Sequence, residues 1–346
     1  MADELQQSIR ALPKIELHRH LEGSVRLSTL VDIARKYGIT MAEYEVDALR
    51  PLVQVMPDEP RTWQNFLAKF QTLRQFYLSA DVIKRIAYES VVDAADDNVR
   101  YMELRFTPKA LCAITKSAIS DVVRWVCEAV QEATREHDIM VRLIVSMNRH
   151  ESVQIGEMAT RAAIDYMHMG VVGLDLAGIE AGYRAAPFRD IFRLGRDAGL
   201  RITLHAGEWA GPESVWDAIG NVGTDRIGHG IRSIEDSGVI SVLKEREITL
   251  EVCPSSNVDS GVVADLGAHQ LSALDAAGVM VTINTDDPMV SGITLSDELE
   301  RVVRDLSMTI DDVKRLTMNA ARAVFLPDSE RQALVERFNR MLYPQQ

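Results

Sequence analysis

Short runs of apolar and β-branched residues recur along the chain, and segments with an apolar residue every three or four positions separate them. Each run has the length and composition of a buried β-strand, and each interval after the second run has room for one helix and two loops. Strands that alternate with helices pair in parallel through right-handed crossovers. The predicted strands cover residues 14–20, 99–106, 140–147, 171–178, 201–208, 225–230, 248–254 and 279–287.

The number of strand–helix units indicates the architecture. Eight units are the number that closes a (β/α)8 TIM barrel, and an open doubly wound sheet is the alternative that the same alternation allows. We therefore predict an α/β fold, a TIM barrel, in one domain that spans residues 1–346.

The interval between the first two predicted strands is the longest, which indicates inserted helices. Helical periodicity covers residues 27–38, 62–77 and 81–95 within it. We expect an insertion at about residues 24–98 that lies at the C-terminal mouth of the barrel and forms a helical lid.

Local signals mark the ends of these helices. Gly38 is the expected C-cap of the first helix, and Asp81 is the expected N-cap of the third. The second helix carries an apolar stripe, for which packing in the core is the alternative to a role in the lid. The stripe consists of Trp63, Phe66, Leu67, Phe70 and Leu73.

The overall composition narrows the class of partner and compartment. The 346 residues are 47% apolar and 26% charged, which is ordinary for a globular protein. The net charge of −13 argues against nucleic acid or an anionic membrane as the main partner. The polar N-terminus, the three widely spaced cysteines and the lack of a long uncharged apolar run predict a cytoplasmic protein. The pattern predicts no particular oligomeric state.

The stretch "KIELHRHLEGS" contains His18 and His20 at alternate positions of the first predicted strand, so both side chains point into the barrel. An HxH pair alone is a weak metal signal, because a histidine with satisfied hydrogen bonds in the core explains either position. Other polar residues strengthen the metal signal, because they lie at the carboxyl ends of predicted strands, where barrel enzymes place their catalytic groups. These residues are His205, His229, Asp286 and Asp287.

A cluster of imidazoles and carboxylates at one rim would bury polar groups at high cost unless a cation joined them. Imidazole nitrogens with one carboxylate oxygen suit zinc, with iron, cobalt or manganese as alternatives. Such a metal lowers the pKa of bound water to about 7, which predicts attack of hydroxide on an electrophilic carbon. Glu208 follows His205 by three residues, and burial there would make it a proton donor. A residue at the start of the following helix is the alternative interpretation of Glu208.

Eight motifs occur in an order that is highly specific. Together they resemble the adenosine deaminases and related aminopurine deaminases of the amidohydrolase superfamily, from about Pro13 to Pro288. The zinc signature of cytidine deaminases is absent. The motifs are "ELHRHLEGS", "FLAKF", "YMELRFTP", "LDLAG", "HAGE", "RIGHG", "EVCPSSN" and "NTDDP".

The resemblance implies a role for each site residue, with one zinc ion per chain as the cofactor. Glu208 would protonate N1 of a purine, His229 would position the metal-bound water and stabilise or deprotonate it, and Asp287 would hold that water and the departing amine. The other implied roles are those of metal ligand (His18, His20, His205 and Asp286), substrate contact (His20, Glu22, Gly178 and Asp287) and hydrophobic lid (Phe66, Leu67 and Phe70).

Four positions bear on the substrate. Glu22 stands where many adenosine deaminases have the aspartate that contacts ribose, and it is the residue typical of adenine deaminases. In contrast, Gly228 is typical of the nucleoside enzymes, and Ile179 replaces an acid that adenosine deaminases usually have. Trp209 stands where smaller residues are common, and we expect its ring to narrow the pocket or to stack beside the ligand, with packing as the alternative.

The sequence thus predicts a small aminopurine as the partner and conversion of adenosine to inosine and ammonia as the reaction. Deamination of adenine, of a modified adenosine or of an adenine nucleotide is the first alternative. Another amidohydrolase reaction and a binding protein that has lost the chemistry are further alternatives. The binding protein fits poorly, because every residue of the expected site is present.

Overall fold

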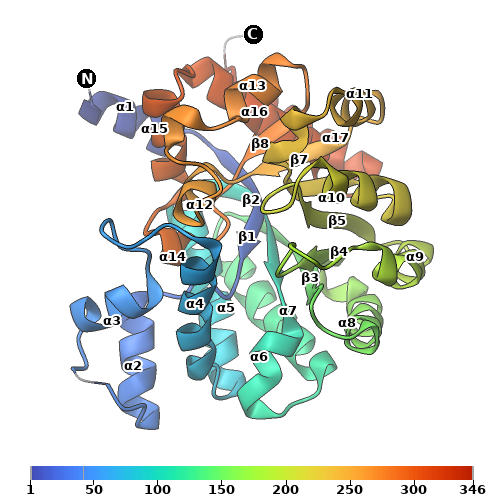
Figure 1. Cartoon of the computed structure of the whole chain (residues 1–346). Helices are drawn as coiled ribbons and strands as arrows, with labels where there is room; N and C mark the ends of the chain where they lie inside the picture. The colour runs from blue at the N-terminus through green and yellow to red at the C-terminus, as the bar shows by residue number, and fades with distance from the viewer. Residues whose placement is uncertain (1, 42, 345–346) are drawn as a thin grey trace.

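The computed structural model describes residues 2–41 and 43–344, and it contains one sheet of eight parallel strands in the order in which they occur along the chain. Figure 1 shows the strands around a central axis with helices outside them. The strands are β1 (Lys14–His20), β2 (Val99–Phe106), β3 (Met140–Asn148), β4 (Val171–Ala177), β5 (Arg201–Ala206), β6 (Arg226–His229), β7 (Thr249–Val252) and β8 (Val281–Ile283).

The sheet closes where the segment after β8 meets β1. An isolated bridge pairs Arg19 with Asp286, His20 N donates to Asp286 O over 2.7 Å, and Asp286 N donates to His18 O over 2.9 Å. The TIM barrel prediction is therefore confirmed, and the alternative of an open sheet is wrong. The last strands are shorter than predicted, and β8 ends at Ile283, before Asp286 and Asp287.

Helices surround the barrel, and α2, α3, α4 and α5 occupy the interval between β1 and β2. The first nine are α1 (Ala2–Ala11), α2 (Leu27–Tyr37), α3 (Val46–Val53), α4 (Trp63–Leu73), α5 (Ala80–Asp96), α6 (Pro108–Thr115), α7 (Ile119–Glu136), α8 (Val153–Asp165) and α9 (Arg189–Asp197). The others are α10 (Pro212–Asp217), α11 (Ser237–Glu245), α12 (Pro254–Asp259), α13 (Leu271–Ala276), α14 (Pro288–Ser291), α15 (Leu295–Asp305), α16 (Ile310–Ala323) and α17 (Asp328–Leu342). Among the residues that the structure describes, no helix is long and apolar enough to cross a membrane.

The predicted helix caps are half right. Gly38 ends α2 in the left-handed conformation, with φ of 68°, as a C-cap glycine should. The prediction for Asp81 is wrong, because Ser79 is the N-cap of α5 and its Oγ accepts a hydrogen bond from Val82 N. Asp81 instead lies in the first turn, where its charge favours the helix dipole.

The alternation of β1 divides its side chains between two environments. Ile15 and Leu17 point outward and pack in an apolar cluster with Phe338 and Leu342 of α17. His18 points the other way, into the barrel, and is fully buried. The outward residues therefore fix the face of β1 that the histidines use.

The barrel interior is polar at its centre. Glu251 on β7 accepts hydrogen bonds from Arg226 Nε over 2.6 Å, from Arg105 Nη2 over 2.6 Å and from Thr203 Oγ1 over 3.1 Å. His18 Nδ1 lies 2.8 Å from the same carboxylate. Buried charges persist only when they are paired and hydrogen-bonded, and these contacts fulfil that condition for Glu251.

A second buried carboxylate joins α15 to the start of α12. Glu298 accepts hydrogen bonds from Ser255 N, over 2.7 Å, and from Ser255 Oγ. Arg301 Nη1 in turn donates a hydrogen bond to Ser255 Oγ. Burial raises the pKa of Glu298 to about 7, the nearby Asp259 carboxylate adds to the rise, and the bonds from Ser255 and the charge of Arg301 oppose it. The protonated form is therefore the one that the fold accommodates best.

We predict that the Glu298→Gln variant loses less stability than the wild type between about pH 5 and about pH 8. The pKa of Glu298 is raised on folding, so its stabilising contribution is complete below the unfolded-state pKa of 4.5 and is lost as the pH rises through about 7. The full loss is about 3 kcal/mol at 1.36 kcal/mol for each pKa unit. Urea unfolding at both pH values measures it.

Glu300→Gln, a partly exposed change on the same helix, is the matched control and should retain the pH dependence of the wild type. An equal loss of unfolding free energy in the wild type and in Glu298→Gln would contradict the prediction.

Candidate active site

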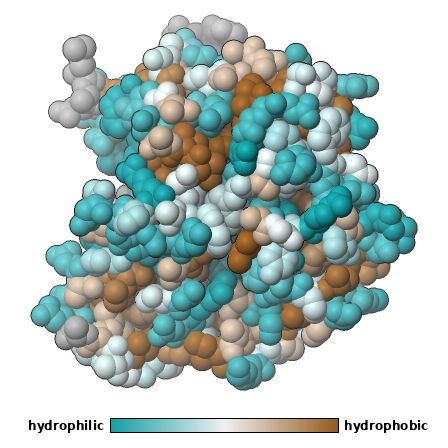
Figure 2. All heavy atoms as spheres, in the orientation of Figure 1, coloured by the Kyte–Doolittle hydropathy of each residue, from teal (hydrophilic) through white to brown (hydrophobic). Residues whose placement is uncertain are grey.

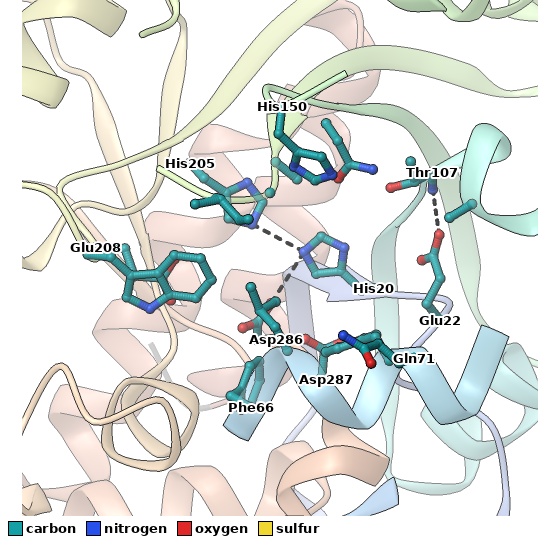
Figure 3. Close-up of a pocket in the computed structure, with 18 of the residues that line it drawn as sticks. His20, Glu22, Phe66, Gln71, Thr107, His150, His205, Glu208, Asp286 and Asp287 are labelled. Carbon is teal, nitrogen blue, oxygen red and sulfur yellow. Dashed lines mark hydrogen bonds and ion pairs between the residues drawn. The ribbon is translucent and has the colours of Figure 1, made fainter. Parts of the chain in front are cut away.

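A cavity of about 220 Å³ opens at the C-terminal ends of the strands. Residues of α4 form one wall, and residues at or after the ends of the strands, including the segments after β1, β2, β3, β4, β5 and β8, form the others (Figure 3). Figure 2 shows that polar and apolar side chains are interspersed on the face of the molecule that Figure 1 presents. The cavity is lined by His20, Glu22, Phe66, Leu67, Phe70, Gln71, Arg74, Thr107, Ala110, Asn148, His150, Ala177, Gly178, Ile179, His205, Glu208, Trp209, His229, Asp286 and Asp287.

Four of the predicted residues form a compact group. His18 and His20 come from β1, His205 comes from β5, and Asp286 follows β8. Their potential ligand atoms all lie within 4.8 Å of one another. His20 Nε2 is 3.2 Å from His205 Nε2 and 3.3 Å from Asp286 Oδ1 (Figure 3).

Hydrogen bonds on the far side of two rings indicate what this group can bind. His18 Nδ1 lies 2.8 Å from Glu251 Oε2, and His205 Nδ1 lies 3.0 Å from Asp175 Oδ1. Both carboxylates accept a hydrogen bond from Nδ1–H, so each Nε2 keeps its lone pair. His18 Nε2 is buried and makes no hydrogen bond. Lone pairs that converge in this way fit a cation.

A second group within the described part of the chain shares two of these residues. It replaces His20 and His205 by His229 and Cys253 and retains His18 and Asp286. Cys253 is buried, which raises the pKa of its thiol well above its usual value. The sequence provided no signal for Cys253 as a ligand.

Close backbone approaches and left-handed residues shape the site. His229, with φ of 57°, and Asp286, with φ of 63°, both adopt the left-handed region that residues other than glycine rarely occupy. A Cβ on Gly23 would lie 2.0 Å from Asp287 Oδ1, so only glycine permits that carboxylate its position. Such strained positions are typical of functional sites.

Glu208 is buried in the same cavity, with Oε2 3.7 Å from His229 Nε2. Burial raises the pKa of Glu208 well above its usual value, and the negative charges of Asp286 and Glu180 raise it further. These effects favour the protonated carboxyl, which is the state that a general acid needs.

The other two carboxylates of the cavity each have an oxygen without a hydrogen-bond partner. Asp287 Oδ1 is buried and unpartnered, and burial together with the negative charge of Asp286 raises the pKa of Asp287. Glu22 Oε1 accepts from Thr107 N over 2.7 Å, whereas its Oε2 has no partner. Burial raises the pKa of Glu22 as well. Both residues line the cavity, and the two unpartnered oxygens are buried.

The remaining predicted residues also lie at the cavity. Gly178 has φ of 85°, and a Cβ there would approach His150 Nδ1 to 2.9 Å. The α4 residues Phe66, Leu67 and Phe70 line the wall, with the two phenyl rings 5.9 Å apart. Trp209 also lines the cavity, and its ring lies 6.0 Å from that of Trp63 at the start of α4.

Sequence reasoning missed the residue that holds the loop of Glu208. Glu180 is buried and accepts four backbone N–H groups, those of Gly207, Glu208, Trp209 and Ala210, over 2.6 to 3.1 Å. It also missed Asp175 and Glu251, which orient the rings of the histidines. The signal available for these two is an acidic residue inside an otherwise apolar strand.

Comparison with known proteins agrees with this geometry. The adenosine deaminase family model matches residues 13–341. An adenosine deaminase of Klebsiella pneumoniae subsp. pneumoniae is 37% identical over 330 residues, which make up 94% of this chain and 98% of that enzyme.

Solved structures with the same fold include deaminases of other substrates. An adenine deaminase of Arthrobacter aurescens has a TM-score of 0.87 at 26% identity and covers 95% of this chain and 98% of its own. An N6-methyl-AMP deaminase of Arabidopsis thaliana has a TM-score of 0.85 at 28% identity, with 99% and 100% covered. An amidohydrolase of Burkholderia ambifaria with bound zinc has a TM-score of 0.84 at 26% identity, with 97% and 93% covered. The match to the family model over almost the whole chain, with a relative that is 37% identical, shows that the chain belongs to the adenosine deaminase family.

Proposed function

We propose that this hydrolytic deaminase converts adenosine to inosine and ammonia. The proposal rests on Glu208, a buried carboxyl whose environment favours the protonated form, and on the group of three histidines and an aspartate beside it. His20, His205 and Asp286 of that group line the same cavity as Glu208. Deamination of an aminopurine requires protonation of a ring nitrogen, and Glu208 can supply that proton. The family relationship supports the same reaction.

The residues proposed to hold the metal are His18, His20, His205 and Asp286. Their donor set, three imidazoles and one carboxylate, suits zinc, and the zinc-bound relative supports that choice. When bound, zinc supplies hydroxide at neutral pH by lowering the pKa of water to about 7.

The protein side chains would perform the rest of the reaction. Glu208 donates its proton to N1 of the purine, which withdraws electrons from C6 and makes that carbon a better electrophile. Hydroxide adds at C6, and the 6-amino group gains the proton that the water lost and leaves as ammonia. N1 keeps its proton in the 6-oxopurine, and the proton of the new C6 hydroxyl returns to Glu208. Asp287, which lines the cavity, holds the attacking water and the departing amine. Phe66 and Phe70 exclude solvent from the ring.

The lining of the cavity favours a nucleoside over the alternatives. The free oxygen of Glu22 can bond a ribose hydroxyl, and the backbone N–H of Gly178 is proposed to meet N3. A Cβ on Gly228 would approach His18 Cε1 to 2.8 Å, so the aspartate that adenine deaminases tend to have there would displace a proposed ligand. For a nucleotide, Arg74 is the one arginine or lysine among the lining residues, and the carboxylates there would repel a phosphate.

The test of this proposal is ammonia release by the zinc-loaded protein from a panel of aminopurines. The panel contains adenine, adenosine, deoxyadenosine, 5′-methylthioadenosine, AMP and N6-methyl-AMP. We expect the highest kcat/KM with adenosine and deoxyadenosine. A preference for adenine or for a nucleotide would favour an alternative substrate, and silence across the panel with zinc bound would contradict deamination.

We predict that Glu208→Gln lowers kcat by about 10²- to 10⁴-fold, the usual contribution of a general acid. The amide has the shape of the carboxyl but no acidic proton, so zinc content should not change. Steady-state kinetics and metal analysis measure the two effects. Glu245→Gln, an exposed change on α11, is the control and should behave as the wild type. A Glu208→Gln enzyme with wild-type kcat would exclude Glu208 as the acid.

We predict that His18→Ala loses zinc and activity together, because it removes one of the converging ligand atoms. Metal content after gel filtration is the readout. His168→Gln changes a histidine far from the cavity lining and should retain both zinc and activity. Full zinc occupancy in His18→Ala would contradict the ligand assignment.

A further inference from the structure

A chain of hydrogen bonds extends behind His229, away from the cavity. Leu271 N donates to His269 Nδ1 over 3.0 Å, and His269 Nε2 lies 3.2 Å from Asn257 Oδ1. Asn257 Nδ2 then lies 3.0 Å from His229 Nδ1. All four residues are buried, so water does not compete for these bonds.

The backbone at one end determines the direction of every bond in the chain. The N–H of Leu271 can only donate, so His269 Nδ1 must accept and the proton of the neutral ring is on Nε2. That N–H donates to the carbonyl oxygen of Asn257. The amide nitrogen of Asn257 therefore faces His229 and donates to its Nδ1. The Nδ1 of His229 holds a lone pair, and its proton is on Nε2.

His269 and Asn257, which together we call the relay, are uncharged at neutral pH. Burial lowers the pKa of His269 to about 4, so this ring carries a single proton at neutral pH. Asn257 does not titrate. The direction of the relay thus does not reverse in the physiological range.

We propose that Asn257 and His269 are positioning residues that fix His229 as a hydrogen-bond donor through Nε2. Nε2 lies 3.7 Å from Glu208 Oε2 and 3.8 Å from Asp286 Oδ2, so the protonated edge faces the reacting groups. There it donates to the oxygen that adds to C6, as charge develops on that atom, and does not act as the base. This catalytic role rests on the proposed deamination, whereas the tautomer does not.

The contrast with the proposed ligands supports the assignment. Behind His18 and His205 lie the carboxylates of Glu251 and Asp175, which accept from Nδ1 and leave Nε2 without a proton. Behind His229 lies a donor, which has the opposite effect. A protonated Nε2 cannot bind a metal, so the relay excludes this nitrogen from the ligand set.

The first test is a direct observation of the tautomer in the zinc-loaded full chain labelled with 15N-histidine. Two-bond 1H–15N correlation spectra distinguish protonated from unprotonated ring nitrogens, and spectra of His229→Gln and His269→Gln assign the signals. We expect both His229 and His269 to carry a proton on Nε2 and a lone pair on Nδ1. A proton on Nδ1 of His229 would overturn the proposal.

Asn257→Asp tests the consequence for catalysis. The carboxylate has the shape of the amide but only accepts, so the proton of His229 should move to Nδ1. We expect kcat to fall about 10²-fold, the effect of removing one donor to a developing oxyanion, with KM changed less than about twofold. Asn339→Asp, an exposed change on α17 with the same effect on net charge, should match the wild type.

The two tests distinguish failure of the tautomer assignment, failure of the catalytic role and failure of the proposed function. A reversed tautomer in Asn257→Asp with wild-type kcat would overturn the catalytic role, and a purely structural role would change thermal stability and KM without moving the proton. If the wild type deaminates no aminopurine, the proposed function fails, yet the 15N spectra still decide the tautomer.

Discussion

The buried carboxylate of Glu251 is the interaction on which the barrel and its site both depend. It pairs with Arg105 and Arg226 in the middle of the barrel, and it orients His18 at the same time. Removing any partner would leave a charge without compensation in a place that water does not reach, at a cost of several kcal/mol. The polar interior thus fixes the ring of His18 before a metal or a substrate arrives.

Neighbouring charges and burial also give the carboxyl groups of the cavity different pKa values. Burial raises the pKa of Asp286, but the neighbouring rings of His18, His229 and His20 outweigh burial and hold that pKa well below the usual range. Glu208 and Asp287 lie beside that negative charge in the same buried volume, so their pKa values are raised. Environments that shift the pKa values of neighbouring carboxyl groups in opposite directions suit one group to metal binding and another to proton donation.

The sequence predicts the residues that form this site better than it predicts the residues that position them. Alternation along the first strand and the position of polar residues at the ends of strands are sufficient to bring His18 and Asp286 together, because a closed barrel gathers all strand ends at one rim. Glu180 and Asn257 are different, since the partner of each lies on another element and only the tertiary fold selects it. The N-cap of α5 depends on a similar choice, because Ser79 and Asp81 are both capable of capping and the path of the chain before the helix selects Ser79.

In the proposed mechanism, a metal ion and a proton donor lie on either side of C6 of a purine nucleoside in one cavity. A crystal structure of the zinc-loaded protein with a non-hydrolysable purine nucleoside, with anomalous scattering measured at the zinc edge, tests it most directly. We expect one zinc peak between His18, His20, His205 and Asp286, with Glu208 within hydrogen-bond distance of N1. A peak at the group that contains His229 and Cys253, or a purine whose N1 points away from Glu208, would contradict it.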